Sequence, residues 1–363
     1  MNPPRTTADV AESIAPTHSE PEGASGEPPV PATPAAAGDL PDRSDGPPAQ
    51  VDGTERTAAR PLPLPSELAA LQHQLATALG APLAETGWPS LIEGLMRRCR
   101  ALVQRDADSL LYLLVQGANR PQEHYSSQHA LFCGVVVELC LQHLEFSDAE
   151  RQAVVLAALT MNVSMTELQD ELIHRERTPT LDQRRAIDGH PQASAELLRR
   201  AGIRDEAWLE IVALHHTDPA PELPYGALSA TQRLASVLRR ADVFTAKISS
   251  RRFRAGMPAT LAARAACLGP NGQPDQVGSA VIKSLGMYPP GSYVRLASGE
   301  VAVVTRRGAK TNEPIVASLV GRDGRALPAA TPRDTAQRAY AVTGVARAAE
   351  IRVPTAPLRM GTD

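Results

Sequence analysis

Five polar residues lie on helical, otherwise apolar segments and are of the types that bind metal ions or phosphate: His129, His190, His215, His216 and Asp242. A buried imidazole or carboxylate is costly unless it has a partner, so several of them converging on a helical core indicate a metal or phosphate site. Between the first two histidines runs the apolar segment 157–165, which has no ligand of comparable strength. The sequence therefore predicts a metal or phosphate site to which the segment 157–165 contributes no ligand.

Two of these histidines also have explanations that need no ligand. His129 shares a helix face with Cys133 and Cys140, and a histidine on an apolar stripe is often a hydrogen-bonded core residue. His190 precedes Pro191, which suits the first position of a helix, so His190 is also a candidate N-cap. A cap of this kind requires no function.

The adjacent pair His215-His216 and the downstream Asp242 indicate a ligand site more strongly. Two neighbouring imidazoles near a helix end reach two neighbouring points, which suits two metals or one metal plus a substrate. Asp242 lies on a stripe of mostly small residues where another helix packs closely, and a carboxylate there needs a cation or donors. Arg239 or Arg240 could pair with it, although both fall on other faces of the helix.

The elements that must position these side chains are helices over most of the chain. Apolar spacing, caps and breakers predict helices at about 66–80, 90–104, 107–116, 127–143, 181–187, 190–200, 208–216, 229–249 and 276–285. The period then changes to alternation, which predicts three short strands at 292–296, 301–305 and 315–320.

The first 62 residues differ in amino-acid composition from the rest of the chain. Residues 1–62 hold twelve prolines, ten acids, four arginines and no Phe, Trp or Tyr, so they cannot bury enough surface to offset the entropy of ordering. We therefore predict a disordered acidic arm over 1–63. The net charge of −3 leaves about +3 on the remainder, which is too little to imply nucleic acid.

The composition also excludes several classes of protein. The four cysteines are scattered without a Cys-x-x-Cys pair, which excludes a disulfide framework and a structural zinc site. The N-terminus lacks an apolar signal-peptide core, and the longest apolar run is too short to cross a bilayer. We expect a cytoplasmic protein with neither a membrane nor a nucleic acid as partner.

At these motifs the chain resembles a known family. From about residue 110 to 320 it resembles the HD-GYP proteins, bacterial cyclic di-GMP phosphodiesterases of the HD phosphohydrolase superfamily. The residues that carry the resemblance are the segment 285–300 (LGMYPPGSYVRLASGE), His190-Pro191, His215-His216, Ala241-Asp242 and the basic run 251–254.

The resemblance implies roles for particular residues. It places His129, His190, His215, His216 and Asp242 on metal-ligand positions, with one divalent ion, iron or manganese, as the expected cofactor. It places Arg251 and Arg254 on the phosphates of the dinucleotide; by themselves they fit a solvated basic turn equally well.

The chain departs from the family pattern at several positions. Met161-Asn162 stands where the family has the His-Asp pair whose Asp bridges two metals, and Ser164-Met165 stands where Gly-Lys follows. Tyr125 occupies a place where trinuclear members carry a Glu, and only Leu223-Pro-Tyr225 represents the Gly-Tyr-Pro loop. An amide and a thioether do not compensate two divalent charges, so efficient two-metal catalysis is not expected.

The resemblance and the patterns together predict the architecture. We expect a mostly α protein: an HD-domain helical bundle with a small C-terminal β appendage and a disordered N-terminal arm. The expected divisions are the arm 1–63, a helical lead-in 64–116, an HD-GYP-like domain 117–288, a β appendage 289–330 and a tail 331–363.

Two functions remain open from the sequence. One is a divergent HD-GYP protein of cyclic di-GMP signalling, catalytically weak or inactive, which acts as a sensor of cyclic di-GMP or docks a signalling protein. The alternative is an active metal-dependent phosphohydrolase, for cyclic di-GMP or another phosphate ester, that uses the residual His/Asp set.

Overall fold

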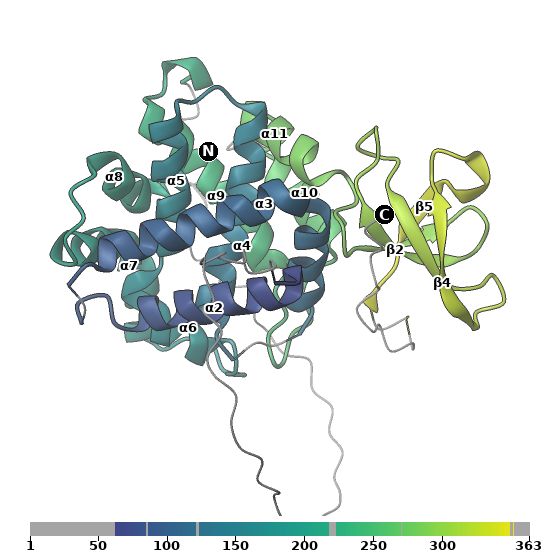
Figure 1. The fold of residues 1–363 in the computed structure, drawn as a ribbon, viewed down its shortest axis with the longest axis horizontal. Helices are drawn as coiled ribbons and strands as arrows, with labels where there is room; N and C mark the ends of the chain where they lie inside the picture. Colours follow the sequence, from purple (N-terminus) through teal and green to yellow (C-terminus); the bar gives the residue numbers. More distant parts are fainter. Residues whose placement is uncertain are drawn as a thin grey trace, which may run out of the picture. The chain divides into compact units, whose positions relative to one another are not determined.

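The computed structural model describes residues 62–84, 86–120, 123–217, 223–269, 271–348 and 351. The acidic arm predicted as disordered lies outside these residues, apart from its last two positions. The protein is mostly helical with a small C-terminal antiparallel sheet, as predicted (Figure 1).

The helices pack around one continuous apolar core. Their bounds are α2 (Leu64–Gly80), α3 (Trp88–Ala118), α4 (Tyr125–Cys140), α5 (Asp148–Thr160), α6 (Thr166–Leu172), α7 (Leu181–Arg200), α8 (Glu206–Leu214), α9 (Ala230–Ile248), α10 (Ala259–Cys267) and α11 (Gln276–Leu285), with short 3-10 turns at η1 (Leu141–His143), η2 (Val163–Met165) and η3 (Tyr225–Ala227). Every residue of α4 except Tyr125 and Gln128 is buried, so α4 is the central helix.

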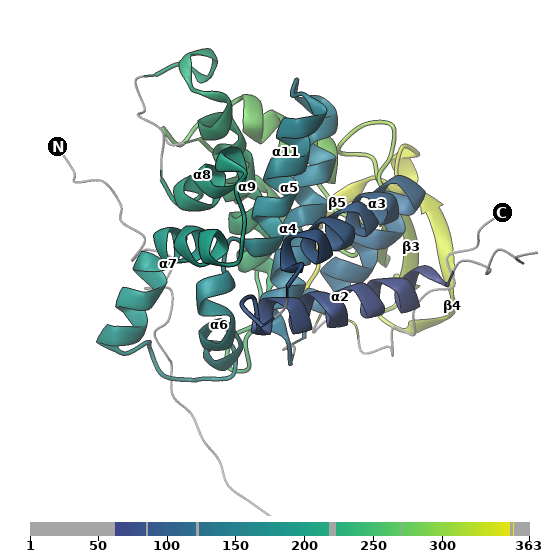
Figure 2. The same ribbon diagram turned by 60° about the vertical axis from the view of Figure 1, so that its left-hand side comes forward.

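The helices of the lead-in belong to the same core as the rest. Helices α2 and α3 lie side by side and both pack on α4 (Figure 1). Helices α7 and α8 lie on the side of α4 that faces away from the sheet (Figure 2). Helix α4 also packs against α9, the helix that carries Asp242.

Three predicted helix boundaries differ in the structure. Helix α2 begins at Leu64 with Pro63 as N-cap, so Ser66 is not the cap. Pro65 suits the first turn because it has no N–H that would need an acceptor there. The two helices predicted on either side of residue 106 form one element, α3, that is bent at Asp106 (φ −162°, ψ 88°). Helix α7 runs unbroken through Pro191, so the prediction that His190 caps a new helix was wrong.

The sheet has five antiparallel strands in the order β4-β3-β2-β1-β5. They are β1 (Tyr293–Leu296), β2 (Val301–Arg306), β3 (Ile315–Val320), β4 (Ala326–Asp334) and β5 (Val342–Val345). The first three were predicted. Strands β4 and β5 were missed, and both extend into residues that we had assigned to a tail from 331.

The sheet meets the helical part through α3, which contacts β2. Gln116 of α3 donates to the carbonyl of Gly291 (2.6 Å) and accepts from the Tyr293 hydroxyl (3.0 Å). Asp108 of the same helix accepts from Arg307 Nε at 2.6 Å. The sheet therefore packs against the C-terminal part of α3.

Among the described residues, no helix is both long and apolar enough to cross a membrane.

Candidate metal centre

Four helices bring the five predicted ligands together. His129 lies in the first turns of α4, Asp242 lies in the middle of α9, and His190 lies at the midpoint of α7. His215 and His216 follow the last residue of α8 directly. The indole of Trp208 in α8 donates to Thr160 Oγ1 of α5 at 2.8 Å, a buried bond that fixes α8 and hence the two histidines after it.

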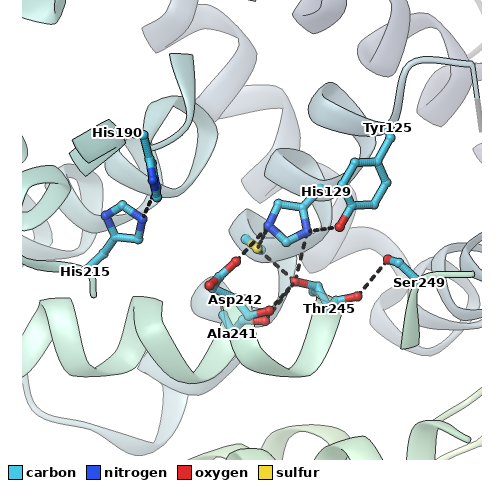
Figure 3. Close-up of polar contacts among 9 residues, drawn as sticks. Tyr125, His129, His190, His215, Ala241, Asp242, Thr245 and Ser249 are labelled. Carbon is cyan, nitrogen blue, oxygen red and sulfur yellow. Dashed lines mark hydrogen bonds and ion pairs between the residues drawn. The ribbon is translucent and has the colours of Figure 1, made fainter. Parts of the chain in front are cut away.

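Within the described part of the chain these side chains form two groups whose possible ligand atoms lie within 4.8 Å of one another. The first group is His190, His215 and His216, which we call the triple-histidine group. The second is His129, Cys133 and Asp242, which we call the His–Asp group. Figure 3 shows His190 and His215 of the first group beside His129 and Asp242 of the second.

The backbone fixes the tautomer of both buried members of the triple-histidine group. His190 Nδ1 lies 2.5 Å from the carbonyl of Ile187, and His215 Nδ1 lies 2.6 Å from the carbonyl of Val212. A carbonyl oxygen only accepts, so each Nδ1 carries the proton and each Nε2 keeps its lone pair.

The proline that we took for a helix start explains one of these bonds. Pro191 has no N–H, so the carbonyl of Ile187, four residues earlier, loses its ordinary helical donor. The imidazole of His190 supplies the missing donor. The His190-Pro191 pair therefore orients a ring from inside a continuous helix.

The two bare nitrogens face each other in a manner that favours a cation between them. His190 Nε2 and His215 Nε2 lie 3.1 Å apart, and the rings are 2% and 0% exposed. Burial lowers the pKa of His190 to about 4, and burial, followed by the charges of His216 and His190, lowers the pKa of His215 well below its usual value. Both shifts favour neutral rings, so with each Nδ1 proton directed to a carbonyl the two Nε2 lone pairs face each other.

A single divalent ion would resolve this clash. Imidazole nitrogens bind transition metals at ~2.0–2.1 Å, so two nitrogens 3.1 Å apart can share one ion. The His216 ring lies 4.2 Å from that of His215 and 5.0 Å from that of His190, centroid to centroid, and offers a third nitrogen. Arg239 of α9 donates to the backbone carbonyl of His216 and holds this residue in place.

The His–Asp group is arranged differently, because its two strongest members already bind each other. His129 Nε2 lies 2.8 Å from Asp242 Oδ1. On the other side of the ring, Nδ1 lies 3.3 Å from Thr245 Oγ1 and 3.4 Å from the Tyr125 hydroxyl (Figure 3). Thr245 itself donates to a carbonyl of its own helix, so its oxygen is free to accept from the ring.

This arrangement favours an ion pair. Burial opposes a charge on His129, but Cys133, Tyr125 and the hydrogen bond to Asp242 raise its pKa well above the usual value. Burial likewise opposes a charge on Asp242, but its hydrogen bond with His129 and the nearby histidines lower its pKa well below the usual value. At neutral pH the group is an imidazolium bound to a carboxylate.

The two groups are close enough to act on each other. Asp242 partly offsets the lowering of the pKa of His190 and of His215. With its side chain 14% exposed, Asp242 is also the group's most open member. Its carboxylate is thus the candidate fourth ligand for an ion at the triple-histidine group.

Met161 and Asn162, which the resemblance set against the His-Asp pair of the HD-GYP proteins, lie in the core beside α7. Met161 is fully buried, and Asn162 is 7% exposed with an Oδ1 that has no hydrogen-bond partner in the described ranges. Ser164 donates to the carbonyl of His190 and contacts Ser194 Oγ at 2.9 Å, which ties η2 to α7. Met165, at the end of η2, is partly exposed.

The two predicted phosphate ligands lie on the loop after α9. The backbones of Arg251 and Arg254 bond each other in a tight turn, and Arg252 N–H donates to the carbonyl of Ile173 beside α6. Arg254 is half-buried, and its Nε has no hydrogen-bond partner among the residues described. Partial burial, then the charge of Arg251, lowers the pKa of Arg254, whereas Tyr125 raises it. Arg254 thus lies near Tyr125, at the side of the His–Asp group.

A cavity of about 180 Å³ opens next to Tyr125 and His129. Its remaining lining comes from α2, the end of α3 with Arg120 after it, further residues of α4, and Ser249 and Ser250 after α9. The lead-in helices therefore form part of the surroundings of the His–Asp group.

The sequence did not reveal two members of the site. Cys133 Sγ lies 3.7 Å from His129 Nε2 and 3.1 Å from Thr245 Oγ1, yet Cys133 was named from the sequence only as part of the apolar face that carries His129. Thr245 was not singled out at all. The spacing of 129 with 133, and of 242 with 245, is the signal that could have found them, since residues three and four apart share a helix face.

Comparison with known proteins bears on these observations. A cyclic di-GMP phosphodiesterase of Pseudomonas aeruginosa is 29% identical to the chain over 210 residues, which is 56% of this chain. The match covers 49% of that relative, so the chain spans about half its length. No protein-family model and no solved structure matches the chain. The similarity to a cyclic di-GMP phosphodiesterase supports the HD-GYP relationship that the motifs indicated.

Proposed function

We propose that the chain is a divergent HD-GYP-type protein of cyclic di-GMP signalling that holds one divalent ion and acts as a sensor or docking module, with weak or no hydrolysis. The observation that carries the proposal is the difference between the two side-chain groups. In the triple-histidine group, the Nε2 atoms of His190 and His215 are available to bind an ion. In the His–Asp group, His129 Nε2 is already bonded to Asp242.

The ion would be held by His190, His215 and His216, with Asp242 as the nearest carboxylate. An ion there supplies a Lewis acid that polarises a phosphoryl oxygen and lowers the pKa of bound water. The carbonyls of Ile187 and Val212 fix the orientation of the His190 and His215 rings. In this proposal Arg251 and Arg254, on the loop after α9, attract the phosphates of the dinucleotide.

A second ion lacks its ligands in this chain. The amide of Asn162 carries no charge, and Met161 offers only a soft thioether. The hydrogen bond between His129 and Asp242 favours the protonated imidazole, and a protonated imidazole binds no metal. We therefore do not expect two-metal phosphodiester hydrolysis, although in this proposal the loop with Arg251 and Arg254 still binds phosphate.

The first test is metal content and turnover of the full chain purified without chelators. We expect about one ion per chain, binding of cyclic di-GMP by titration calorimetry, and hydrolysis far below the ~1–10³ s⁻¹ of ordinary enzymes. His215→Ala should lose the ion, whereas His174→Ala, at an exposed histidine, should keep it. Ordinary turnover that His215→Ala abolishes would instead support the active phosphohydrolase.

A reconstruction tests the role given to positions 161 and 162. The double variant Met161→His with Asn162→Asp restores the residue types of the family pair. We expect it to bind a second ion and to gain hydrolysis of cyclic di-GMP relative to the unaltered chain. If it binds no second ion while remaining folded by circular dichroism, positions 161 and 162 are not the missing ligands.

A further inference from the structure

A second cavity lies away from the candidate metal centre, where the end of α11 meets the loop between β2 and β3. Its volume is about 220 Å³, and it is lined by His143, Lys283, Gly286, Tyr288, Arg307, Gly308, Ala309, Thr311 and Pro314. None of these residues belongs to the triple-histidine group or to the His–Asp group. We call it the basic pocket.

Three basic side chains from three separate elements converge on this pocket. His143 comes from η1, Lys283 from the last turn of α11, and Arg307 from the residue after β2. The pKa of His143 is lowered first by partial burial and then by the positive charges of Lys283 and Arg307. The three groups therefore face one another, which isolated surface charges do not.

The acids near the pocket are already paired. Asp108 is held by Arg307 through a 2.6 Å contact to Nε, and Glu313 is held by Lys310 at 3.0 Å. Neither acid lines the pocket. Lys283 and His143 have no hydrogen-bond or ion-pair partner within the described stretches of chain. Asp108 balances part of the charge of Arg307, so the charge in the lining that has no matching carboxylate is that of Lys283.

The walls of the pocket are fixed before any ligand arrives. The backbone N–H of Met287 donates to the carbonyl of Thr311 at 2.8 Å, which joins the segment after α11 to the β2–β3 loop. Arg307 also donates through Nη1 to the carbonyl of Ser284 at 2.8 Å. Its Nη2 has no partner in the described residues and remains available as a donor. A preorganised guanidinium with a free edge is suited to phosphate oxygens.

We propose that the basic pocket binds the phosphate group of a small organic phosphate, at a site separate from the candidate metal centre. Lys283 and Arg307 supply charge, and His143, Tyr288 and Thr311 supply ring and hydroxyl donors. The volume lies below the ~300–1,000 Å³ of pockets that take drug-sized ligands, so the pocket suits one phosphate with a small organic part. A cyclic dinucleotide is too large for it.

The test is titration calorimetry of the full chain with inorganic phosphate and with glycerol 3-phosphate at constant ionic strength. We expect one site per chain for which the two probes compete, and no competition from cyclic di-GMP. Lys283→Gln should weaken binding at least tenfold, His143→Gln should weaken it less, and both should fold normally because both side chains are exposed. Lys310→Gln removes a lysine from the same loop region, outside the pocket lining, and should leave affinity unchanged.

Three results would overturn the proposal. One is affinity for phosphate that Lys283→Gln leaves intact. Another is binding that persists in Lys283→Gln but disappears in His215→Ala, which would place the phosphate at the candidate metal centre. The last is displacement of phosphate by cyclic di-GMP, which would make the pocket part of the dinucleotide site.

Discussion

The contact between His129 and Asp242 determines what the His–Asp group can do. The imidazole is 2% and the carboxylate 14% exposed, so each ion depends on the other to remain charged in the core. A proton held on His129 by this pair would keep the imidazole from binding a metal ion. The chemistry of the site is thus set by which buried nitrogens carry protons.

Removing one member of the pair should destabilise the fold. Asp242→Ala leaves the buried His129 without its carboxylate, and we expect the free energy of unfolding at pH 7 to fall by about 3–5 kcal/mol. Chemical denaturation of the chelator-treated protein measures it. Glu210→Ala, at an exposed acid of α8, is the control and should change little. The additional change His129→Leu should recover part of the loss; a purely additive double variant would contradict the pairing.

The triple-histidine group should make the metal-free protein sensitive to acid. The folded pKa of His190 is lowered to about 4 from an ordinary 6.5, and that of His215 is also lowered. The unfolded chain therefore binds more protons below pH 6.5, so stability is complete above that pH and falls as the pH drops toward 4. The raised pKa of His129 and the lowered pKa of Asp242 act outside this window, above and below it respectively.

We expect the slope to reach at most about 1.4 kcal/mol per pH unit for each titrating group. Urea denaturation at several values between pH 7.5 and 4.5, in the presence of a chelator, measures it. His190→Asn should flatten the curve, and His174→Asn should not. An equally steep curve for His190→Asn would show that another group is responsible.

At the scale of elements, helix α7 was the least predictable part of the site. A proline after a histidine indicates a helix start, and the sequence carries no sign that an imidazole will replace the missing N–H inside a helix. Periodic spacing was enough for α9 and α11, whose predicted bounds agree with the structure to within a residue. Local sequence patterns thus predicted the helices, but not the bond from His190 to the carbonyl of Ile187 with which α7 continues through Pro191.

Pro191 should therefore affect metal affinity more than stability. Pro191→Ala restores an N–H that competes with His190 for the carbonyl of Ile187, so the ring loses its fixed tautomer. We expect metal affinity to fall about tenfold, in the range found when a partner of a metal-binding histidine is removed, with no loss of thermal stability. Competition titration with a chromophoric chelator measures the affinity. Glu196→Ala on the exposed face of α7 is the control, and equal affinity for Pro191→Ala would contradict the role.

At the scale of the whole molecule, the sheet was the part that the sequence described incompletely. Strands β1 to β3 are rich in Val, Ile and Leu, whereas β4 contains Pro328 and Pro332 and β5 spans only four residues. Both missed strands lie at the sheet's edges, where proline is tolerated because no neighbour needs its N–H. Strand β5 pairs with β1, which lies far away in the chain, and a local pattern cannot show such a partner.

The packing of the sheet on α3 depends on a close approach of Gly291 to the helix. Gly291 has φ +89°, and a Cβ there would lie 2.8 Å from Val115 Cβ and 3.0 Å from the carbonyl of Tyr112. Gly291→Ala should lower the free energy of unfolding by about 1–3 kcal/mol, from backbone strain and overpacking. Gly344→Ala in β5, where a Cβ meets nothing within 4 Å, is the matched control. Equal melting temperatures for the two variants would contradict this account.

The carbonyl bonds that orient His190 and His215 exist only when α7 and α8 are formed, so the unfolded chain has no preset nitrogen pair. An ion that binds only the folded state adds to folding stability by mass action, ~2.7 kcal/mol at a concentration one hundred times its Kd. The cell's supply of divalent metal would then set how much of this protein is folded, and a chain with little or no turnover would still report metal availability through its own abundance.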